Sequence, residues 1–242
     1  MTPLLQVHSV SKSFRGLRAV MGVSFEVEEK TIVALIGPNG AGKTTLFNMA
    51  AGVFAPDSGE ISFDGKSVNG LRPDQVCALG VGRTFQIVKP FAGLSVLDNV
   101  IVGALERSRS VGETRRYAER ILDKLGFGAK RDLPAAALTL PDRKRLEVAR
   151  ALATRPRLLL LDEVMAGLRP TECDRMVALF REINQRDGMT ILLIEHVMRA
   201  VMALAQKVIV LHHGEVIAGG APDQVVREPA VLECYLGEET DL

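Results

Sequence analysis

The stretch TIVALIGPNGAGKTTLF, residues 31–47, decides the fold of this chain. Its first part, residues 31–36, is a continuous apolar run stopped by a glycine, which predicts a short buried strand. Residues 44–51 have helical spacing and predict a helix. Residues 37–44 fit the pattern G-x-x-x-x-G-K-[ST], which is typical of a phosphate-binding loop where it joins a strand to a helix. The alternative, a glycine-rich turn that only begins a helix, does not explain the strand, the spacing, the lysine and the threonine together.

Each residue type in this loop has a chemical reason. Gly40 and Gly42 allow the backbone to curl with its N–H groups pointing inward, at a helix N-terminus whose dipole favours anions. Lys43 is expected to bridge the β- and γ-phosphates of a nucleotide, Thr44 to ligate Mg2+ and Thr45 to add a hydroxyl contact. The candidate nucleotide-binding residues of the loop are Asn39, Gly40, Ala41, Gly42, Lys43, Thr44 and Thr45.

The composition indicates a globular protein with a sizeable core. Of 242 residues, 47% are hydrophobic and 24% are charged, which excludes a disordered chain. The 30 basic and 29 acidic side chains nearly cancel, so no net field favours nucleic-acid binding by counterion release. No apolar run approaches the roughly 18 residues of a membrane span, and residues 1–10 do not resemble a signal peptide. We therefore expect the chain to stay where it is made.

Short strands alternate with helices along most of the chain. Residues 94–133 are helical and charged with no strong strand, which predicts a helical insertion that packs as a subdomain. Elsewhere the alternation predicts a parallel sheet covered by helices on both faces. The other expected elements are strands at 7–14, 23–27, 60–63, 158–161, 190–194, 207–211 and 216–217, a hairpin corner at 64–65, helices at 142–154, 171–186 and 197–204, and a closing helical segment at 222–236.

Two carboxylates follow another buried strand. Residues 158–161 are four leucines, and Asp162 and Glu163 come directly after them. This order places Asp162 at the carboxyl end of a strand beside the phosphate loop, where we expect it to hold Mg2+ through water. Glu163 is expected to polarise the water that attacks the γ-phosphate. The alternative, two carboxylates that cap the next helix, is weakened by the phosphate loop in the same chain.

Gln86 and His196 are weaker signals. Each lies near an apolar stretch, and a single histidine is usually structural. His196 nevertheless follows a predicted buried strand in a chain with a phosphate loop, and this position predicts a contact with a γ-phosphate. The remaining histidines lack such a context and are interpreted as surface or strand-end residues; they are His8, His212 and His213.

The phosphate loop, the glutamine, the pair of carboxylates and the histidine stand in the order and approximate spacing of an ATP-binding cassette (ABC) ATPase, and the chain resembles that family from end to end. The resemblance implies an α/β fold: a RecA-like P-loop NTPase core with a small antiparallel β subdomain and an inserted α-helical subdomain. Residues 1–93 and 150–242 are then the core with its β subdomain in a single ABC ATPase domain, and residues 94–149 approximately the helical subdomain with the signature helix.

The resemblance also implies ATP and Mg2+ as cofactors and roles for single residues. Phe14 stands where the family places an aromatic that stacks on adenine, although Phe14 alone would more often belong to a core. Gln86 stands where the Q-loop meets Mg2+ and the membrane partner. The implied metal ligands are Thr44, Gln86 and Asp162, and the implied catalytic residues are Lys43, Gln86, Glu163 and His196.

Within the family, the chain looks most like the ATPase subunits of importers for branched-chain (hydrophobic) amino acids. This finer match implies an ATPase at the cytoplasmic face of the inner (plasma) membrane, with two permease subunits, a second ABC ATPase subunit and, indirectly, a solute-binding protein, and without nucleic acid. The transported substrate stays open, because such an ATPase is not expected to touch it. The residues of the finer match are 37–47, 94–100, 145–152, 195–198 and 235–239.

Two other functions stay open at this point. Exporter ATPases share the phosphate loop, the glutamine, the two carboxylates and the histidine. Soluble cassette proteins that do not transport anything usually carry two cassettes in one chain, whereas this chain has one phosphate loop. The single loop favours a transporter subunit, and the finer match favours import.

The family's signature, usually Leu-Ser-x-Gly-Gln, reads LTLPD at residues 138–142. Pro141 replaces a glycine whose N–H would face the γ-phosphate of ATP held by the opposite subunit, and Asp142 is expected to bring a negative charge near that phosphate. The alternative is a well-started helix, because Thr139 and Asp142 resemble a capping box and proline suits a first turn. Arg169 replaces the short Asp or Asn that is usual in the family's D-loop. Both changes predict an asymmetric pair of sites, with the weaker one at this chain's signature.

Overall fold

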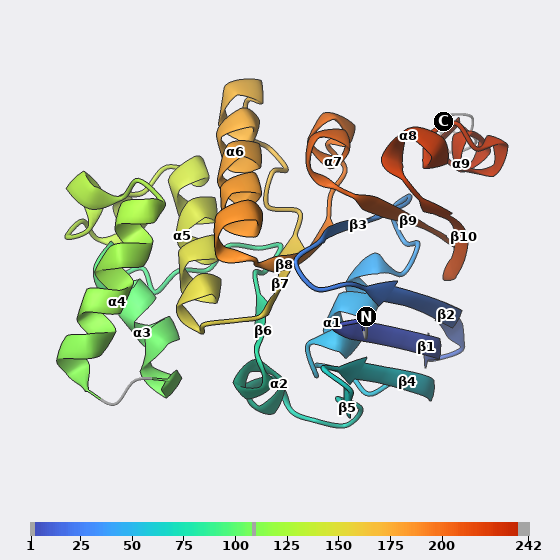
Figure 1. Ribbon diagram of the computed structural model, residues 1–242, viewed down its shortest axis with the longest axis horizontal. Helices are drawn as coiled ribbons and strands as arrows, with labels where there is room; N and C mark the ends of the chain where they lie inside the picture. Colours follow the sequence, from blue (N-terminus) through green and yellow to red (C-terminus); the bar gives the residue numbers. More distant parts are fainter. Residues whose placement is uncertain (1–2, 108–109, 237–242) are drawn as a thin grey trace.

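The structure, a computed structural model, describes residues 3–107 and 110–236 of the chain. Two sheets and a group of helices make up this part (Figure 1). The larger sheet has six strands in the order β10-β9-β3-β8-β7-β6, and the smaller has four in the order β2-β1-β4-β5. Residues 237–239, the end of the finer sequence match, lie outside the described residues.

The larger sheet is the predicted parallel core. Strands β9, β3, β8, β7 and β6 run parallel to their neighbours, and β10 adds an antiparallel edge. Because carboxyl ends of parallel strands meet at one edge of a sheet, the segments that follow β3, β7 and β8 come together there. The strands are β3 (Ile32–Ile36), β6 (Val81–Arg83), β7 (Leu158–Asp162), β8 (Thr190–Ile194), β9 (Lys207–His212) and β10 (Glu215–Gly220).

Side chains of the central strands alternate between two hydrophobic cores. In β7, Leu159 and Leu161 face the core formed with helices α3 to α7, whereas Leu158 and Leu160 face the core shared with α1 and the smaller sheet. All four leucines are fully buried. A strand covered on both faces has no polar side, which explains why this run consists of consecutive leucines.

The smaller sheet is antiparallel, as the family resemblance implied. The expected hairpin corner forms between β4 and β5, where Phe63 pairs with Lys66 and both Asp64 and Gly65 have positive φ. The apolar side of the smaller sheet shares a core with α1 (Lys43–Ala50), the helix that begins at the phosphate loop. The strands are β1 (Leu5–Phe14), β2 (Leu17–Val27), β4 (Ser58–Phe63) and β5 (Lys66–Ser67).

Helices cover the larger sheet and extend beyond it. The expected helical insertion contains α3 (Val96–Ala104) and α4 (Val111–Lys124), which lie on the side of the molecule away from β1, β2 and β4 (Figure 1). Where one subdomain ends and the next begins stays a prediction. The remaining helices are α2 (Pro73–Leu79), α5 (Leu140–Ala153), α6 (Pro170–Asp187), α7 (Met198–Leu204), α8 (Pro222–Val225) and α9 (Pro229–Leu236), with 3-10 turns at Leu105–Arg107, Gly128–Lys130 and Ala135–Ala137.

Several elements differ from the sequence expectation. The closing segment breaks into α8 and α9 because Pro229, the first residue of α9, cannot donate an intrahelical hydrogen bond. Helix α5 begins at Leu140 rather than at residue 142, since a proline fits the first turn. The sequence reading missed α2 and β6, which are too short to show a clear period. Within residues 3–107 and 110–236, no helix combines the length and the apolar character that a membrane crossing requires.

Candidate functional site

The phosphate loop follows β3 and leads into α1, and two glycines make its close packing possible. Gly37 has a φ of +142°, and a Cβ there would stand 2.0 Å from the carbonyl oxygen of Leu211. Gly42 has a φ of +101°, and its Cβ would stand 2.3 Å from the carbonyl oxygen of Ala19. Any side chain at either position would therefore push the loop away from the neighbouring backbone.

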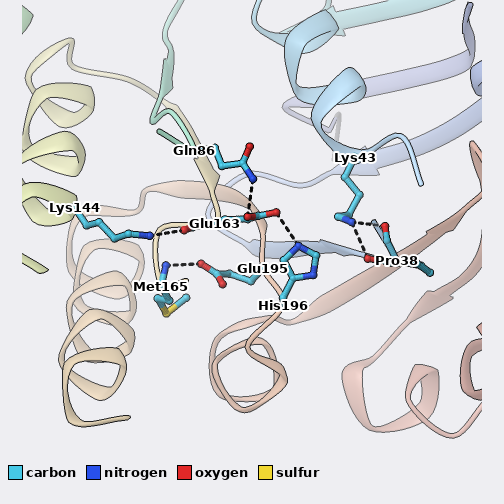
Figure 2. Close-up of polar contacts among 9 residues, drawn as sticks. Pro38, Lys43, Gln86, Lys144, Glu163, Met165, Glu195 and His196 are labelled. Carbon is cyan, nitrogen blue, oxygen red and sulfur yellow. Dashed lines mark hydrogen bonds and ion pairs between the residues drawn. The ribbon is translucent and has the colours of Figure 1, made fainter. Parts of the chain in front are cut away.

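Lys43 is folded over this loop. Its Nζ donates to the carbonyl oxygens of Gly37 and Pro38, both at 2.7 Å (Figure 2). The side chain is buried. The ammonium thus adds its charge to the positive end of the α1 dipole, and the combination suits a bound phosphate.

Asp162 closes β7 and is buried beside the loop. Its N–H donates to Thr84 Oγ1 at 3.1 Å, and Arg83 Nη2 donates to its Oδ2 at 3.3 Å. Burial raises the pKa of Asp162, and the positive charges of Arg83 and Lys43 oppose that rise. Its other oxygen, Oδ1, is buried and has no hydrogen-bond partner among the described residues. An unpaired buried acceptor at this place suits a cation or an ordered water.

Glu163 lies at the meeting point of three strand ends. Its backbone is in the left-handed region, with a φ of +50°. Gln86 Nε2 donates to its Oε2 at 2.8 Å, and His196 Nε2 lies 2.7 Å from its Oε1 (Figure 2). Burial alone would raise the pKa of Glu163, but the hydrogen bonds from Gln86 and His196 outweigh it and lower the pKa. The carboxylate is therefore ionised at neutral pH.

A cavity of about 540 Å³ opens over the phosphate loop. It brings together the candidate residues of the loop with Phe14, Gln86 and Glu163. Phe14 is partly exposed, and Phe54 packs edge-on against it at 5.3 Å between ring centroids. Asp162 and His196 do not line this cavity; Asp162 lines an adjoining hollow, and His196 contacts Glu163, which lines the cavity. The lining consists of Phe14, Leu17, Arg18, Ala19, Asn39, Gly40, Ala41, Gly42, Lys43, Thr44, Thr45, Gln86, Glu163 and His213.

A second hollow of about 440 Å³ lies next to the first. Thr44 and Gln86 line both hollows. Phe85 and Ile87 flank Gln86 with strongly exposed apolar side chains. The second hollow is lined by Thr44, Arg83, Phe85, Gln86, Ile87, Lys89, Glu147, Arg150 and Asp162.

The signature segment differs in detail from the sequence expectation. Thr139 is the N-cap of α5, but its side chain makes no capping hydrogen bond, so the expected capping box is wrong. The hydroxyl donates instead to Asp142 Oδ2 at 3.0 Å. Asp142 is buried and forms ion pairs with Lys130, at 2.5 Å, and with Arg145. Its negative charge is therefore compensated within the chain. The expectation that Asp142 comes near a partner's phosphate stays a prediction.

Other residues at the site were missed by sequence reasoning. Arg83 pairs with Asp162, Lys144 binds the carbonyl oxygen of Glu163, and Glu195 accepts from the N–H of Met165. Their partners come from distant parts of the chain, so no local pattern marks them. The sequence offered a signal for Glu195 alone, because it is a charged residue that directly follows the leucines and isoleucines of β8. His213, interpreted as a strand-end residue, does lie at the β9–β10 turn and also lines the cavity.

Fold and site together define a P-loop ATPase of the cassette class. The family model for the ABC transporter matches residues 20–166, more than half of the chain. The chain belongs to the ABC transporter family, as an ATPase subunit. A second model, for the branched-chain amino acid ATP-binding cassette transporter, matches residues 215–241.

Similar proteins fall into two functional groups. A high-affinity branched-chain amino acid transport ATP-binding protein, BraF of Pseudomonas aeruginosa, is 38% identical over 251 residues, with 98% of each chain covered. LivG of Escherichia coli, with the same description, is 37% identical over 251 residues at the same coverage. A lipopolysaccharide export system ATP-binding protein, LptB of Acidithiobacillus ferridurans, is 35% identical over 239 residues, with 99% of each chain covered.

Solved cassettes have the same fold. A nucleotide-free ATP-binding cassette from an ABC transporter matches with a TM-score of 0.88 and 28% identity, over 97% of this chain and 99% of that one. The ADP conformation of an ATP-binding cassette matches with a TM-score of 0.89 and 29% identity, over 98% and 100% of the two chains. These likenesses confirm the α/β cassette fold that the sequence predicts.

Proposed function

We propose that the chain is the ATP-binding and ATP-hydrolysing subunit of an importer for branched-chain or related amino acids. The main support for this substrate class is the match of residues 215–241 to the family model of the branched-chain amino acid ATP-binding cassette transporter. The full-length likeness to BraF and LivG supports the same class.

ATP would occupy the cavity over the phosphate loop. The backbone N–H groups of residues 39–45 and the Lys43 ammonium would hold the phosphates, because both stand at the positive end of α1. Phe14 lines the same cavity and packs edge-on against Phe54, and its exposed ring would stack on the base.

The residues at the loop also fit Mg2+. Thr44 and Gln86 reach the cavity from one side, and Asp162 contributes a buried oxygen that has no partner among the described residues. Hydroxyl, amide and carboxylate oxygens are the ligands that Mg2+ prefers. When bound, Mg2+ would neutralise the charge that develops on the phosphate oxygens.

Hydrolysis requires a base near the γ-phosphate, and Glu163 suits that role. Its carboxylate is ionised and is oriented by Gln86 on one oxygen and by His196 on the other. It would accept the proton of a water whose oxygen attacks the γ-phosphorus, while the bond to the bridging oxygen of ADP breaks. His196 would also contact the γ-phosphate from the Glu163 side.

Transport would need a second cassette and membrane subunits. The helical segment of residues 94–149 would act as the subdomain that presents the signature to the partner's ATP. The second hollow, with the exposed Phe85 and Ile87 beside Gln86, would receive the permease at the cytoplasmic face of the membrane. Closure of two cassettes on ATP is then the two-state step that moves the permease.

Export is the second candidate function, and one observation favours it. LptB, named for lipopolysaccharide export, is similar to this chain over its full length at 35% identity. A soluble cassette without a membrane partner is a third possibility. The three functions differ in what accompanies the ATPase rather than in its own site.

A membrane pull-down separates these functions. The tagged full chain is used as bait, and the recovered complex is assayed for ATP turnover with and without candidate amino acids and a loaded binding protein. Import predicts two permeases, a second cassette and turnover stimulated by the loaded binding protein. Turnover that responds to a lipid instead would support export, and recovery of no membrane subunit would contradict a transport role.

A further inference from the structure

The three residues after β7 hold a conformation that needs external support. Glu163 has positive φ, which is costly for a residue with a side chain and persists only where the surroundings fix it. Its N–H donates to the carbonyl oxygen of Ile194 at 2.9 Å, in the neighbouring strand. The N–H groups of Ala166 and Leu168 donate to the carbonyl oxygens of Glu163 and Met165 at 3.3 and 3.2 Å. Two ionisable side chains add further contacts to this backbone: Lys144 and Glu195 (Figure 2).

Both side chains bind main-chain atoms rather than substrate-facing groups. Lys144 Nζ donates to the carbonyl oxygen of Glu163 at 2.9 Å. The N–H of Met165 donates to Glu195 Oε1 at 2.7 Å. The two contacts thus clamp the segment 163–165 from opposite ends, while the Glu163 carboxylate points away from them toward Gln86 and His196 (Figure 2).

Burial of the ionisable side chains of Lys144 and Glu195 is unfavourable for the stability of the fold. Lys144 is 6% exposed and Glu195 is 1% exposed. Burial raises the pKa of Glu195 to about 7 against the effects of the Met165 N–H and of Lys144, and burial lowers the pKa of Lys144. Glu195 Oε2 is buried with no hydrogen-bond partner among the described residues. Apolar side chains in such a place are commonly as stable or more stable, so stability alone does not account for this pair.

We propose that Lys144 and Glu195 are positioning residues for hydrolysis, which fix the main chain of residues 163–165 so that the Glu163 carboxylate stays aimed at the attacking water. The inference rests on the proposed role of Glu163 as base. Lys144 comes from α5, and Glu195 directly follows β8 and precedes His196, so the two contacts join the signature helix to the edge of the sheet that carries the proposed catalytic residues. Misplacement of a catalytic group by about 1 Å is enough to lower a rate by on the order of a hundredfold.

The experiment measures ATP turnover in the complex recovered with the full chain, and ATP affinity and melting temperature on the purified full chain. Lys144→Met removes the side-chain donor to the carbonyl oxygen of Glu163, and we expect kcat to fall by about tenfold to a hundredfold while ATP affinity is unchanged. Lys144→Arg keeps a donor and should recover most of the turnover. Lys124→Met, which breaks the surface ion pair between α4 and Asp187 of α6, is the matched control and should keep wild-type turnover.

The double variant Lys144→Met/Glu195→Gln separates positioning from mere stability. The double variant has neither of the two buried ionisable groups. The amide oxygen introduced by Glu195→Gln would still accept from the Met165 N–H. The melting temperature should therefore return toward that of the wild type. Turnover should stay low, because the carbonyl oxygen of Glu163 still lacks its side-chain donor and keeps only the longer hydrogen bond from the Ala166 N–H at 3.3 Å. Recovery of turnover together with stability would overturn the proposal, as would a loss of ATP affinity as large as the loss of kcat.

Glu163→Gln in the same assay tests the base assignment separately. If Glu163→Gln is inactive and Lys144→Met is fully active, the positioning role is wrong and the base assignment stands. If Glu163→Gln hydrolyses ATP at the wild-type rate, the base assignment itself fails.

Discussion

The phosphate loop and the signature segment are two regions of the same cassette, and they differ in how many of the family's usual residues they keep. The loop keeps every residue type that phosphate binding needs: Gly40, Gly42 and Lys43 line one cavity, and Asp162 lines the adjoining hollow. The signature segment, residues 138–142, has lost a backbone donor at Pro141, and its polar side chains bind one another.

We therefore predict that the chain supports the ATP site on its own phosphate loop better than the site that uses its signature segment. Asp142 is ion-paired with Lys130 and Arg145, so its charge is compensated within the chain, whereas Pro141 has no backbone N–H to donate. The predicted asymmetry of the two ATP sites then rests on the missing N–H rather than on an added charge. The following substitutions test the two ends in turn.

The largest effect is expected for Glu163→Gln at the nucleotide end. Loss of the base should lower turnover by about 10²- to 10⁴-fold while ATP binding persists, because the amide keeps the shape but accepts no proton. Single-turnover hydrolysis and binding of a fluorescent ATP analogue would measure the two quantities. Normal turnover would show that another group is the base.

Lys43→Ala should weaken ATP binding itself. Removal of a charged donor from the phosphates is expected to raise the ATP dissociation constant by about tenfold to a hundredfold. Equilibrium titration with ATP would measure this change. Lys66→Ala, on exposed β5, is the matched control and should bind ATP normally.

Asp142→Asn examines the ion pairs at the signature end. Burial would raise the pKa of Asp142, but hydrogen bonds from Lys130, Arg145 and Thr139 outweigh it and lower the pKa below its ordinary 3.8. We expect the variant to lose about 1 kcal/mol of unfolding free energy at neutral pH.

This loss has a defined pH dependence. The stabilisation from a lowered pKa is complete above the ordinary value and disappears as pH falls through the folded-state pKa, so wild type and variant should converge below about pH 4. Urea unfolding between about pH 3 and about pH 7, values chosen around the ordinary carboxyl pKa, would measure this difference. Asp174→Asn, which breaks an exposed pair with Arg199, should show a smaller loss.

Pro141→Gly should raise turnover of the assembled complex. The change restores a backbone N–H at the signature, and one hydrogen bond is worth about twofold to tenfold in rate. Pro141→Ala restores the same donor without the flexibility of glycine, so both variants should gain. If neither gains, the missing donor does not limit the weaker site.

Arg169→Asp is expected to have the smallest effect. Arg169 is exposed at the N-cap of α6, where aspartate is a favourable residue. We expect a gain in turnover of about twofold, typical of an exposed charge, together with a slightly higher melting temperature. Turnover of the complex and melting of the chain alone would separate the two effects.

Much of this architecture could be predicted because its causes are local. The four leucines before Asp162 predict a strand buried on both faces, and the structure confirms that alternate leucines enter two different cores. The phosphate loop is contiguous, so its residues and its strand–loop–helix context were visible in one stretch. The roles assigned to the site residues stay predictions until the substitutions are made.

What could not be predicted depends on contacts between distant segments. The Asp142 carboxylate is neutralised partly by Lys130, which lies on another turn, and the expected capping box gave way to these stronger charged partners. Lys144 and Glu195 meet the backbone of residues 163–165 only after three elements have packed together. The spacing of residues along the chain does not indicate which distant segments come into contact in the fold.

Gln86 lines both the phosphate cavity and the adjoining second hollow, and this has a thermodynamic consequence. A ligand in the phosphate cavity that draws this side chain toward itself alters the shape of the second hollow, and an occupant of the second hollow does the reverse. Linkage requires the two effects on affinity to be equal in size. A partner that docks beside Phe85 and Ile87 and moves Gln86 would therefore be an effector of nucleotide affinity, and the nucleotide would affect docking to the same degree.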